Sequence, residues 1–287
     1  MKILPTRVGI SLVRKGTHVS HLVIRKNASA ASVTLTLDAT RETLDVDIEQ
    51  DAQASLFLIL QGKKSAEHTL QIKLAKRSRL TLVLLSPSSP IPQKILQSIF
   101  VASEASLALT CVTFASSITH ELTSRVEGRG GESVIRWIAY ARDGEKQDLT
   151  LASHFHAKAG RGSVAMRGVA EGRSMLTCRG KVEIGKGAER TQATLSQNLL
   201  MLDAKARVEA IPALEVHTND VRASHAASVT KINENDLFYL SSRGLPREEA
   251  RALCIDGFLD EFLASVTDPT MRRSLEKALT AKKRRKA

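Results

Sequence analysis

The sequence contains few aromatic residues and few cysteines. Phe, Trp and Tyr make up 3% of its 287 residues, so a core has to be built from aliphatic side chains, as suits a narrow, layered interior. The three cysteines, Cys111, Cys178 and Cys254, are widely spaced and form no CxxC pair, which argues against a disulfide framework or a zinc module. Together with the lack of a signal peptide, this predicts a reducing, cytoplasmic compartment.

Long apolar runs and catalytic signatures are also missing. No segment approaches the ~20 apolar residues of a membrane-spanning helix, and Pro5 and Arg7 interrupt the first apolar stretch. We find no GxSxG, P-loop or HExxH motif, and no GxGxxG before a helix. The GRGG run at 128–131 is interpreted as a turn. We therefore expect no membrane association, no enzyme and no nucleotide bound by this chain itself.

The net charge is +12, and a block of five cations contributes much of it. The block consists of Lys282, Lys283, Arg284, Arg285 and Lys286. A basic balance can indicate nucleic-acid binding, but we find no stripe of Lys and Arg interleaved with stacking aromatics. Nucleic acid is therefore not an expected partner, and residues 282–287 are predicted to form a solvated basic tail.

Short segments rich in β-forming residues recur along the first two-thirds of the chain. They start at residues 33, 56, 80, 107 and 134, with intervals of 23, 24, 27 and 27 residues. A period of this size without intervening helices predicts a β-solenoid. The alternative is a β-sandwich, whose strands usually follow at about 8–12 residues. Alternate residues should face inward, which puts Leu56, Leu58 and Leu60 in the core.

From residue 233 the pattern becomes helical. Asn233 can cap a first helix that stops near Gly244, and Pro246 can open a second. The second helix carries an apolar stripe at four-residue spacing, formed by Ala250, Cys254, Phe258, Phe262 and Val266.

A third helix is expected to start at Pro269, with Met271, Leu275 and Leu279 on one face. These patterns predict a β-solenoid core over 1–232 and a helical domain over 233–281, ahead of the basic tail.

Three histidines are candidate ligands. His154 and His156 are two residues apart, so on a strand both point to one face and a metal pair is possible; no third ligand is evident, and ordinary hydrogen-bonded histidines are the alternative. His225 lies among small residues just before the helical unit. A neutral imidazole there could ligate iron or shuttle a proton, or it could be a structural histidine.

The last part of the chain carries a series of short motifs. They are RGKV at 179–182, SQNLL at 196–200, PALEV at 212–216, TNDVRASH at 218–225, NDLFYLSSRG at 235–244, EEA at 248–250 and GF at 257–258. Together they resemble the C-terminal signature of the SufB/SufD family, the scaffold subunits of the Suf iron–sulfur cluster assembly machinery. The resemblance is specific over 130–266, whereas residues 1–130 agree in style only.

The resemblance implies a right-handed parallel β-helix followed by a small helical domain. In the family, two such subunits pair through the ends of their β-helices, and each helical domain docks an ABC-type ATPase, the SufC subunit. ATP-driven closure of the ATPase pair then reshapes the interface at which a cluster is built.

Several positions indicate the branch of the family. Lys205 stands where SufB-type chains have a cysteine, and Ala226 where they have a glutamate. Ala223 replaces a cysteine common in the SufD form, but the histidine itself is kept as His225. The chain thus resembles SufD without its thiol ligands, and any thiolates would come from a SufB-type partner.

The resemblance therefore implies a SufD-like scaffold subunit that pairs with a SufB-like subunit and docks a SufC-type ATPase. A transient iron–sulfur cluster or iron, shared with the partner, would lie at His225. The expected docking residues are Phe238, Tyr239, Arg243, Glu248, Glu249, Phe258 and Phe262, with Phe238 and Tyr239 also packing between helix and β-helix. A homodimeric version of the same machinery and a β-helix polysaccharide lyase are the alternatives, although no carboxylate cluster or aromatic sugar platform supports the lyase.

Overall fold

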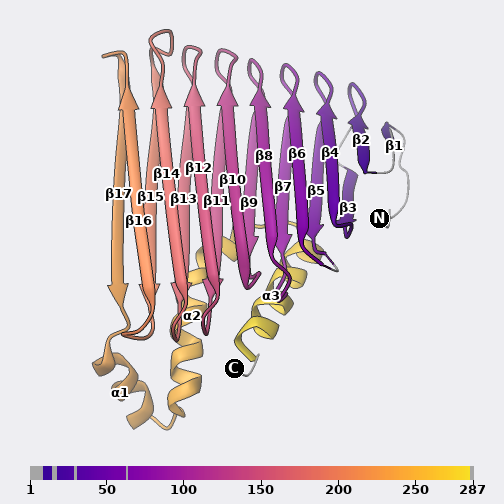
Figure 1. Ribbon diagram of the computed structural model, residues 1–287. Helices are drawn as coiled ribbons and strands as arrows, with labels where there is room; N and C mark the ends of the chain where they lie inside the picture. Colours follow the sequence, from indigo (N-terminus) through magenta and orange to yellow (C-terminus); the bar gives the residue numbers. More distant parts are fainter. Residues whose placement is uncertain (1–8, 15–17, 29–30, 63, 285–287) are drawn as a thin grey trace.

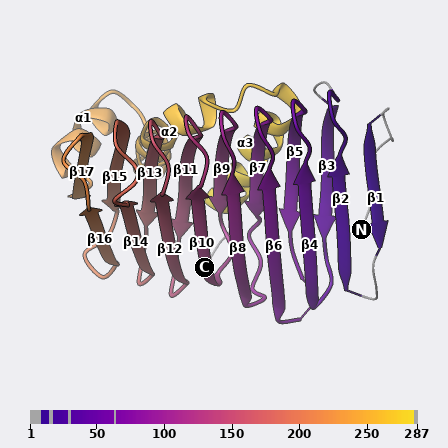
Figure 2. The same cartoon turned by 90° about the horizontal axis from the view of Figure 1, so that it is seen from above.

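The chain winds between two stacked β-sheets, contributing a strand to each sheet in turn (Figures 1 and 2). The computed structural model describes residues 9–14, 18–28, 31–62 and 64–284. The strands with even numbers, together with β1, form one sheet, which we call the even sheet; the remaining strands form the odd sheet. All neighbours run parallel except β1 and β2. The predicted β-solenoid is therefore confirmed, and the sandwich alternative is wrong.

The strands have the following bounds in their spatial order. The even sheet contains β1 (Ile10–Arg14), β2 (Val19–Ile24), β4 (Arg41–Ile48), β6 (Ala66–Leu74), β8 (Gln93–Val101), β10 (Ser117–Val126), β12 (Lys146–Phe155), β14 (Met175–Ile184) and β16 (Arg207–Val216). The odd sheet contains β3 (Ala31–Leu37), β5 (Gln53–Leu60), β7 (Arg79–Ser86), β9 (Ser106–Thr113), β11 (Glu132–Ala141), β13 (Arg161–Ala170), β15 (Thr191–Met201) and β17 (Val221–Lys231).

The repeats detected in the sequence are the strands of the odd sheet. Val33 pairs with Leu56, and Leu80 pairs with Leu107, in direct register. Leu56, Leu58 and Leu60 are fully buried between the sheets, as expected. The interior is thus an aliphatic core that continues from coil to coil.

The outer faces of the two sheets differ. Most strands of the even sheet, such as β8, β10 and β12, alternate strictly between buried and accessible residues. In β7 and β9 the alternation gives way to an unbroken buried run in the second half of the strand, which is the pattern of a strand covered on both sides. The cover is helical: Figure 2 shows α2 and α3 lying along the odd sheet, on the side away from the even sheet.

Three helices follow β17: α1 (Glu234–Ser242), α2 (Arg247–Ala264) and α3 (Pro269–Arg284). None of the described helices is long and apolar enough to cross a membrane. A second apolar cluster joins α2 and α3 to the outer face of the odd sheet. The bulky side chains in this cluster include those of Phe57, Phe114, Ile138, Tyr140, Leu259, Phe262 and Leu275.

The predicted helix starts are confirmed. The side chain of Asn233 accepts a hydrogen bond from the backbone N of Asn235 at 3.0 Å, and Asp268 Oδ1 accepts one from Thr270 N at 2.8 Å. Gly244, with φ of +93°, follows the end of α1. Such a left-handed conformation favours glycine because it has no Cβ.

The predicted apolar stripe of α2 is partly wrong. Ile255, Leu259 and Leu263 form much of the buried face, whereas Cys254 and Phe258 are only partly buried. The reason is geometric: a row at four-residue spacing advances about 40° per step around a helix of 3.6 residues per turn. The expected row therefore lies at the edge of the buried face.

The prediction of a solvated basic tail is also wrong for residues 282–284. Lys282, Lys283 and Arg284 belong to α3, and Lys282 is completely buried. Its ammonium group finds partners in the body of the protein, so the positive charge does not require solvent. Residues 285–287 lie outside the described residues.

Two histidines are enclosed by the solenoid. His68 and His120 are both buried, and His120 Nε2 lies 3.2 Å from Gln97 Oε1. Burial lowers the pKa of His68 to about 4 and that of His120 to about 3, because the interior disfavours the charged imidazolium. Both rings are therefore neutral in the folded protein at neutral pH.

These pKa values predict that stability falls as the pH is lowered below about 6.5, where the unfolded chain protonates each histidine but the folded chain does not. The unfolded state then binds more protons, so its free energy falls relative to that of the folded state. Between pH 6.5 and 5, His120 alone costs up to about 2 kcal/mol of unfolding free energy. Urea unfolding at both pH values should show a smaller loss in His120→Gln.

The matched control is His18→Gln, because His18 is exposed in the folded chain. This substitution should leave the loss of stability between the two pH values unchanged. Equal losses in His120→Gln and the unaltered protein would contradict the assignment.

Candidate functional site

The C-terminal end of the solenoid is open. β16 and β17 are the last strands of their sheets, and each is paired on one side only. Every residue of β17 from Ser224 to Lys231 is exposed. Figure 1 shows α1 below the end of β17 and the other helices along the side of the solenoid. We call the exposed surface of β16 and β17 the open end.

The open end is apolar as well as unpaired. Ile211 is 45% exposed, Val216 42% and Val229 47%. Edge strands with free backbone N–H and C=O groups and accessible apolar side chains are places where another chain adds itself. A solenoid needs a cap at its ends for the same reason, and β17 is left exposed from Ser224 to Lys231.

His225 lies in the middle of β17, opposite Leu195 of β15. Its side chain is exposed, and alanines follow it on the strand. Cys111 and Cys178 are buried in the core, and burial raises the pKa of Cys178 to about 12 and that of Cys111 well above the usual range. His225 is thus an accessible imidazole, and these two thiols are not available to it.

A shallow hollow of about 360 Å³ opens where the chain enters β15 and β17. It belongs to the same end of the solenoid. Its lining residues are Arg190, Thr191, Gln192, Asn219, Asp220, Val221 and Arg222.

The residues predicted to dock a partner fall into two groups, of which one is exposed. On α1, Phe238 is 75% exposed and Tyr239 57%, and the guanidinium carbon of Arg243 lies 5.4 Å from the centre of the Tyr239 ring. Glu248 and Glu249 are exposed at the start of α2. We call these five residues the α1–α2 surface.

The idea that Phe238 and Tyr239 pack between helix and β-helix is wrong. Leu237 is the fully buried residue of α1. Successive residues of a helix point about 100° apart, so the two aromatic rings face away from the side that Leu237 buries.

The second group, Phe258 and Phe262, holds α2 against the odd sheet. The guanidinium carbon of Arg167, on β13, lies 5.6 Å from the Phe258 ring centre and 4.7 Å from that of Phe262. Arg167 also donates to the carbonyl oxygen of Phe258 at 2.7 Å and forms an ion pair with Glu261. Phe262 is only 6% exposed, so it stabilises this contact and is not accessible to a partner.

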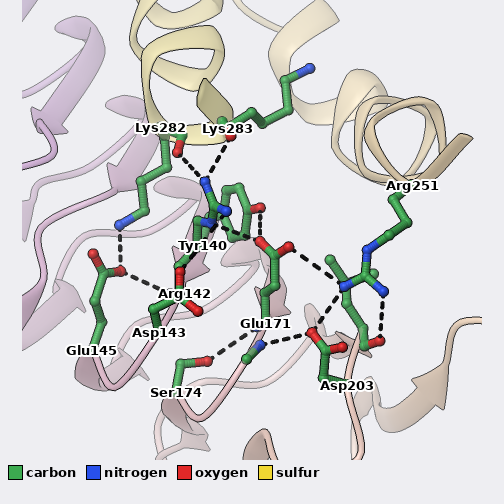
Figure 3. Close-up of polar contacts among 12 residues, drawn as sticks. Tyr140, Arg142, Asp143, Glu145, Glu171, Ser174, Asp203, Arg251, Lys282 and Lys283 are labelled. Atoms are coloured by element: carbon green, nitrogen blue, oxygen red, sulfur yellow. Dashed lines mark hydrogen bonds and ion pairs between the residues drawn. The ribbon is translucent and has the colours of Figure 1, made fainter. Parts of the chain in front are cut away.

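A network of charged residues, drawn in Figure 3, fastens the helices to the turns that follow the odd strands. Glu171 accepts a hydrogen bond from Tyr140 Oη at 2.5 Å and lies 2.7 Å from Arg142 Nε. Burial, and next to it the Glu171 carboxylate, raises the pKa of Tyr140 well above its usual range. Arg251 of α2 reaches Asp203 at 2.9 Å and Glu171 at 3.5 Å.

The same network holds the last turn of α3. Arg142 Nη1 donates to the carbonyl oxygens of Lys282 at 3.0 Å and Lys283 at 2.7 Å. The last carbonyl groups of a helix have no partner within the helix, so Arg142 satisfies two of them. Lys282 Nζ donates to the carbonyl oxygen of Phe114 at 2.8 Å and forms an ion pair with Glu145. We call the contacts in Figure 3 the turn network; our sequence reasoning missed it.

His154 and His156 lie together, as their spacing predicts. They are at the end of β12 on the outer face of the even sheet, with ring centres 6.0 Å apart. A third group that the sequence did not suggest, Glu183 of β14, is beside them: His154 Nδ1 lies 3.2 Å from a Glu183 carboxylate oxygen. Strand register brings it there across 29 positions of the chain.

Comparison with known proteins gives one family match. Residues 15–258 match the family described as "SUF system FeS cluster assembly, SufBD core domain".

The chain is also similar to individual proteins with related names. It is 34% identical over 139 residues to the iron–sulfur cluster assembly protein SufD of Bacillus subtilis, covering 48% of this chain and 32% of that protein. A SufBD family protein of Mycobacterium leprae is 33% identical over 134 residues, which cover 46% of this chain and 15% of that protein. A second SufBD family protein, from Mycobacterium tuberculosis, is 32% identical over 162 residues, which cover 53% of this chain and 40% of that protein. The chain thus matches less than half the length of each of these relatives.

The turn network predicts that Lys282→Met strongly lowers the stability of the protein. The substitution removes the cation that pairs with the Glu145 carboxylate. Breaking a buried ion pair typically costs several kcal/mol; because Glu145 also accepts hydrogen bonds from Ser116 Oγ and Arg142 N, we expect a loss of about 3 kcal/mol of unfolding free energy. Urea unfolding at neutral pH measures it.

Lys277→Met is the control, since Lys277 is exposed on the same helix and loses no buried contact. It should unfold at nearly the same urea concentration as the unaltered chain. Equal stability of the two variants would show that the network does not hold α3.

Proposed function

Since this chain belongs to the SufBD family of the SUF iron–sulfur cluster assembly system, we propose that it is a SufD-like scaffold subunit. Its open end pairs with the corresponding end of a SufB-like subunit, and the two solenoids continue into one another. The chain supplies a surface and a rigid frame, and does no chemistry by itself.

One observation carries this proposal: the last coil is uncovered. The exposed Ile211, Val216 and Val229 lie on strands that still have a free edge. α2 and α3, which could have capped this end, lie along the odd sheet instead. A second solenoid would satisfy both the free backbone groups and the apolar side chains.

His225 then lies at the shared interface. A transient iron–sulfur cluster, or iron on its way into one, is the cargo, and a neutral imidazole is a suitable ligand for it. The buried position of Cys111 and Cys178 supports the view that thiolates come from the partner.

The α1–α2 surface is the docking site for a SufC-type ATPase. Its exposed aromatic rings, together with the charged Arg243, Glu248 and Glu249 on the same pair of helices, are residue types of an interface centre and rim. The turn network and the contacts of Arg167 tie α2 and α3 to the solenoid, and α1 packs against α2. Movement of a docked ATPase would thus be carried to the solenoid, and through it to the open end.

A homodimer of this chain is the second candidate, because the open end could also pair with another copy of itself. The polysaccharide lyase has no support from the family match. The experiment below separates the two kinds of dimer.

Charge at the open end should abolish pairing. Ile211→Glu and Val229→Glu each put an unpaired carboxylate into an apolar interface, and a change at a hot-spot position costs about 2 kcal/mol or more, or roughly thirtyfold in affinity. Co-purification with the SufB-like subunit, and light scattering of the chain alone, give the readout. Loss of a SufB-like partner supports the heterodimer, and loss of a self-dimer supports the second candidate.

The control is Leu96→Glu, an exposed leucine on β8, far from the open end in the strand order. It should pair normally. Retained pairing by both open-end variants, with unaltered melting temperatures, would rule out the open end as the interface.

The α1–α2 surface gives a separate prediction. Phe238→Asp and Tyr239→Asp should weaken ATPase binding by about thirtyfold or more at unchanged melting temperature, because neither ring is buried in the chain. Isothermal titration calorimetry with the purified ATPase measures the affinity.

Thr280→Asp, at an exposed position of α3, is the matched control and should bind normally. Phe262→Asp is unsuitable, since its effect would come from detaching α2. If the two α1 variants bind the ATPase as tightly as the control, the docking assignment is wrong.

A further inference from the structure

A cluster of two histidines and a glutamate stands on the outer face of the even sheet, away from the helices. His154 is near the end of β12, His156 directly follows that strand, and Glu183 is on β14 as the register partner of His154. Each of the three residues offers a ligand atom, and these atoms lie within 4.8 Å of one another. We call these residues the histidine cluster.

The spacing within the histidine cluster suits one small ion. Two ligand atoms, each about 2.1 Å from a tetrahedral metal ion, are about 3.4 Å apart. His154 Nδ1 and the Glu183 carboxylate oxygen are 3.2 Å apart, so little movement is needed for both to bind the same ion.

His156 is oriented by a further carboxylate. Its Nδ1 lies 3.0 Å from Glu127 Oε1, which leaves Nε2 for a ligand. A carboxylate hydrogen-bonded to the far nitrogen of a ligating histidine is the usual outer partner in metal sites, because it fixes the tautomer and the ring orientation. Glu127 directly follows β10, the neighbour of β12 in the even sheet, so this support comes from the adjacent strand.

We propose that His154, His156 and Glu183 bind a divalent first-row transition ion, such as Fe²⁺ or Zn²⁺. Two imidazoles and one carboxylate favour these ions over Mg²⁺ and Ca²⁺, which prefer oxygen ligands alone. Three protein ligands leave positions free for water or for a ligand supplied by another molecule.

Lys181 competes with the ion for Glu183. Its Nζ lies 2.9 Å from Glu183 and 2.9 Å from Glu215 of β16. Binding of the ion therefore exchanges an ammonium group for a metal on the same carboxylate. Glu183 also belongs to a second group of possible ligands, with Glu215 and His217. The histidine cluster therefore adjoins β16, a strand of the open end.

None of His154, His156 and Glu183 belongs to the open end or to the α1–α2 surface, so metal binding can be tested on the chain without a partner or an ATPase. The test uses the full chain without a histidine tag, freed of metal by a chelator. Co²⁺ is titrated without oxygen and followed by its visible absorption, and Zn²⁺ is then added to displace it. We expect saturable binding of Co²⁺ and its displacement by Zn²⁺.

Substitutions locate the ion. His154→Ala, His156→Ala and Glu183→Gln should each weaken Co²⁺ binding by more than about tenfold, because the loss of a mere outer-shell partner already costs about that much. Lys181→Met should tighten it, since the competing ammonium group is gone. A merely structural role for Lys181 would not produce tighter binding.

His21→Ala is the control. His21 is also on the even sheet, its side chain has the same 19% exposure as that of His154, and it contacts Asp47 at 2.7 Å. Its removal should leave Co²⁺ binding unchanged. The proposal is overturned if Co²⁺ does not saturate the chain, if the cluster substitutions have no effect, or if His21→Ala weakens binding as much as they do.

Discussion

The apolar outer face of the odd sheet is the constraint on which the rest of the structure depends. Residues such as Phe57, Phe114 and Ile138 would be in water if nothing covered that face, and burying a large apolar side chain contributes about 1.5–3 kcal/mol. The helices that cover it therefore lie along the side of the solenoid. As a consequence they leave the open end uncovered, and this end is where a partner can add to the sheets.

Charge then determines how firmly the helices are held. Arg142, Glu171 and Arg251 connect the turns of the odd strands to α2 and α3, and Lys282 is buried together with its counter-charge. Such contacts are specific in geometry as well as favourable in energy. The helices and the solenoid thus form one body, with an exposed aromatic surface on α1 and an open end on β17.

The even sheet shows the opposite case. Nothing among the described residues covers its outer face in the way that the helices cover the odd sheet, so polar side chains are retained there and line up across strands. In a parallel coil, residues in register on successive turns are neighbours in space although the chain separates them by a full turn. This is how Glu183 comes to stand beside His154, and how a carboxylate row can continue to Glu215.

The sequence by itself determined the solenoid, the helix starts at Asn233 and Pro269, and the resemblance to the SufB/SufD family. These follow from local periodicity, capping residues and motifs, all of which are read within a few positions. Only the tertiary structure decided that both aromatic rings of α1 are exposed and that Phe262 is buried against Arg167. It also decided that Lys282 is internal and that Glu183 completes the histidine cluster. Those outcomes depend on strand register and on helix packing between residues far apart in the chain, and no local pattern records either.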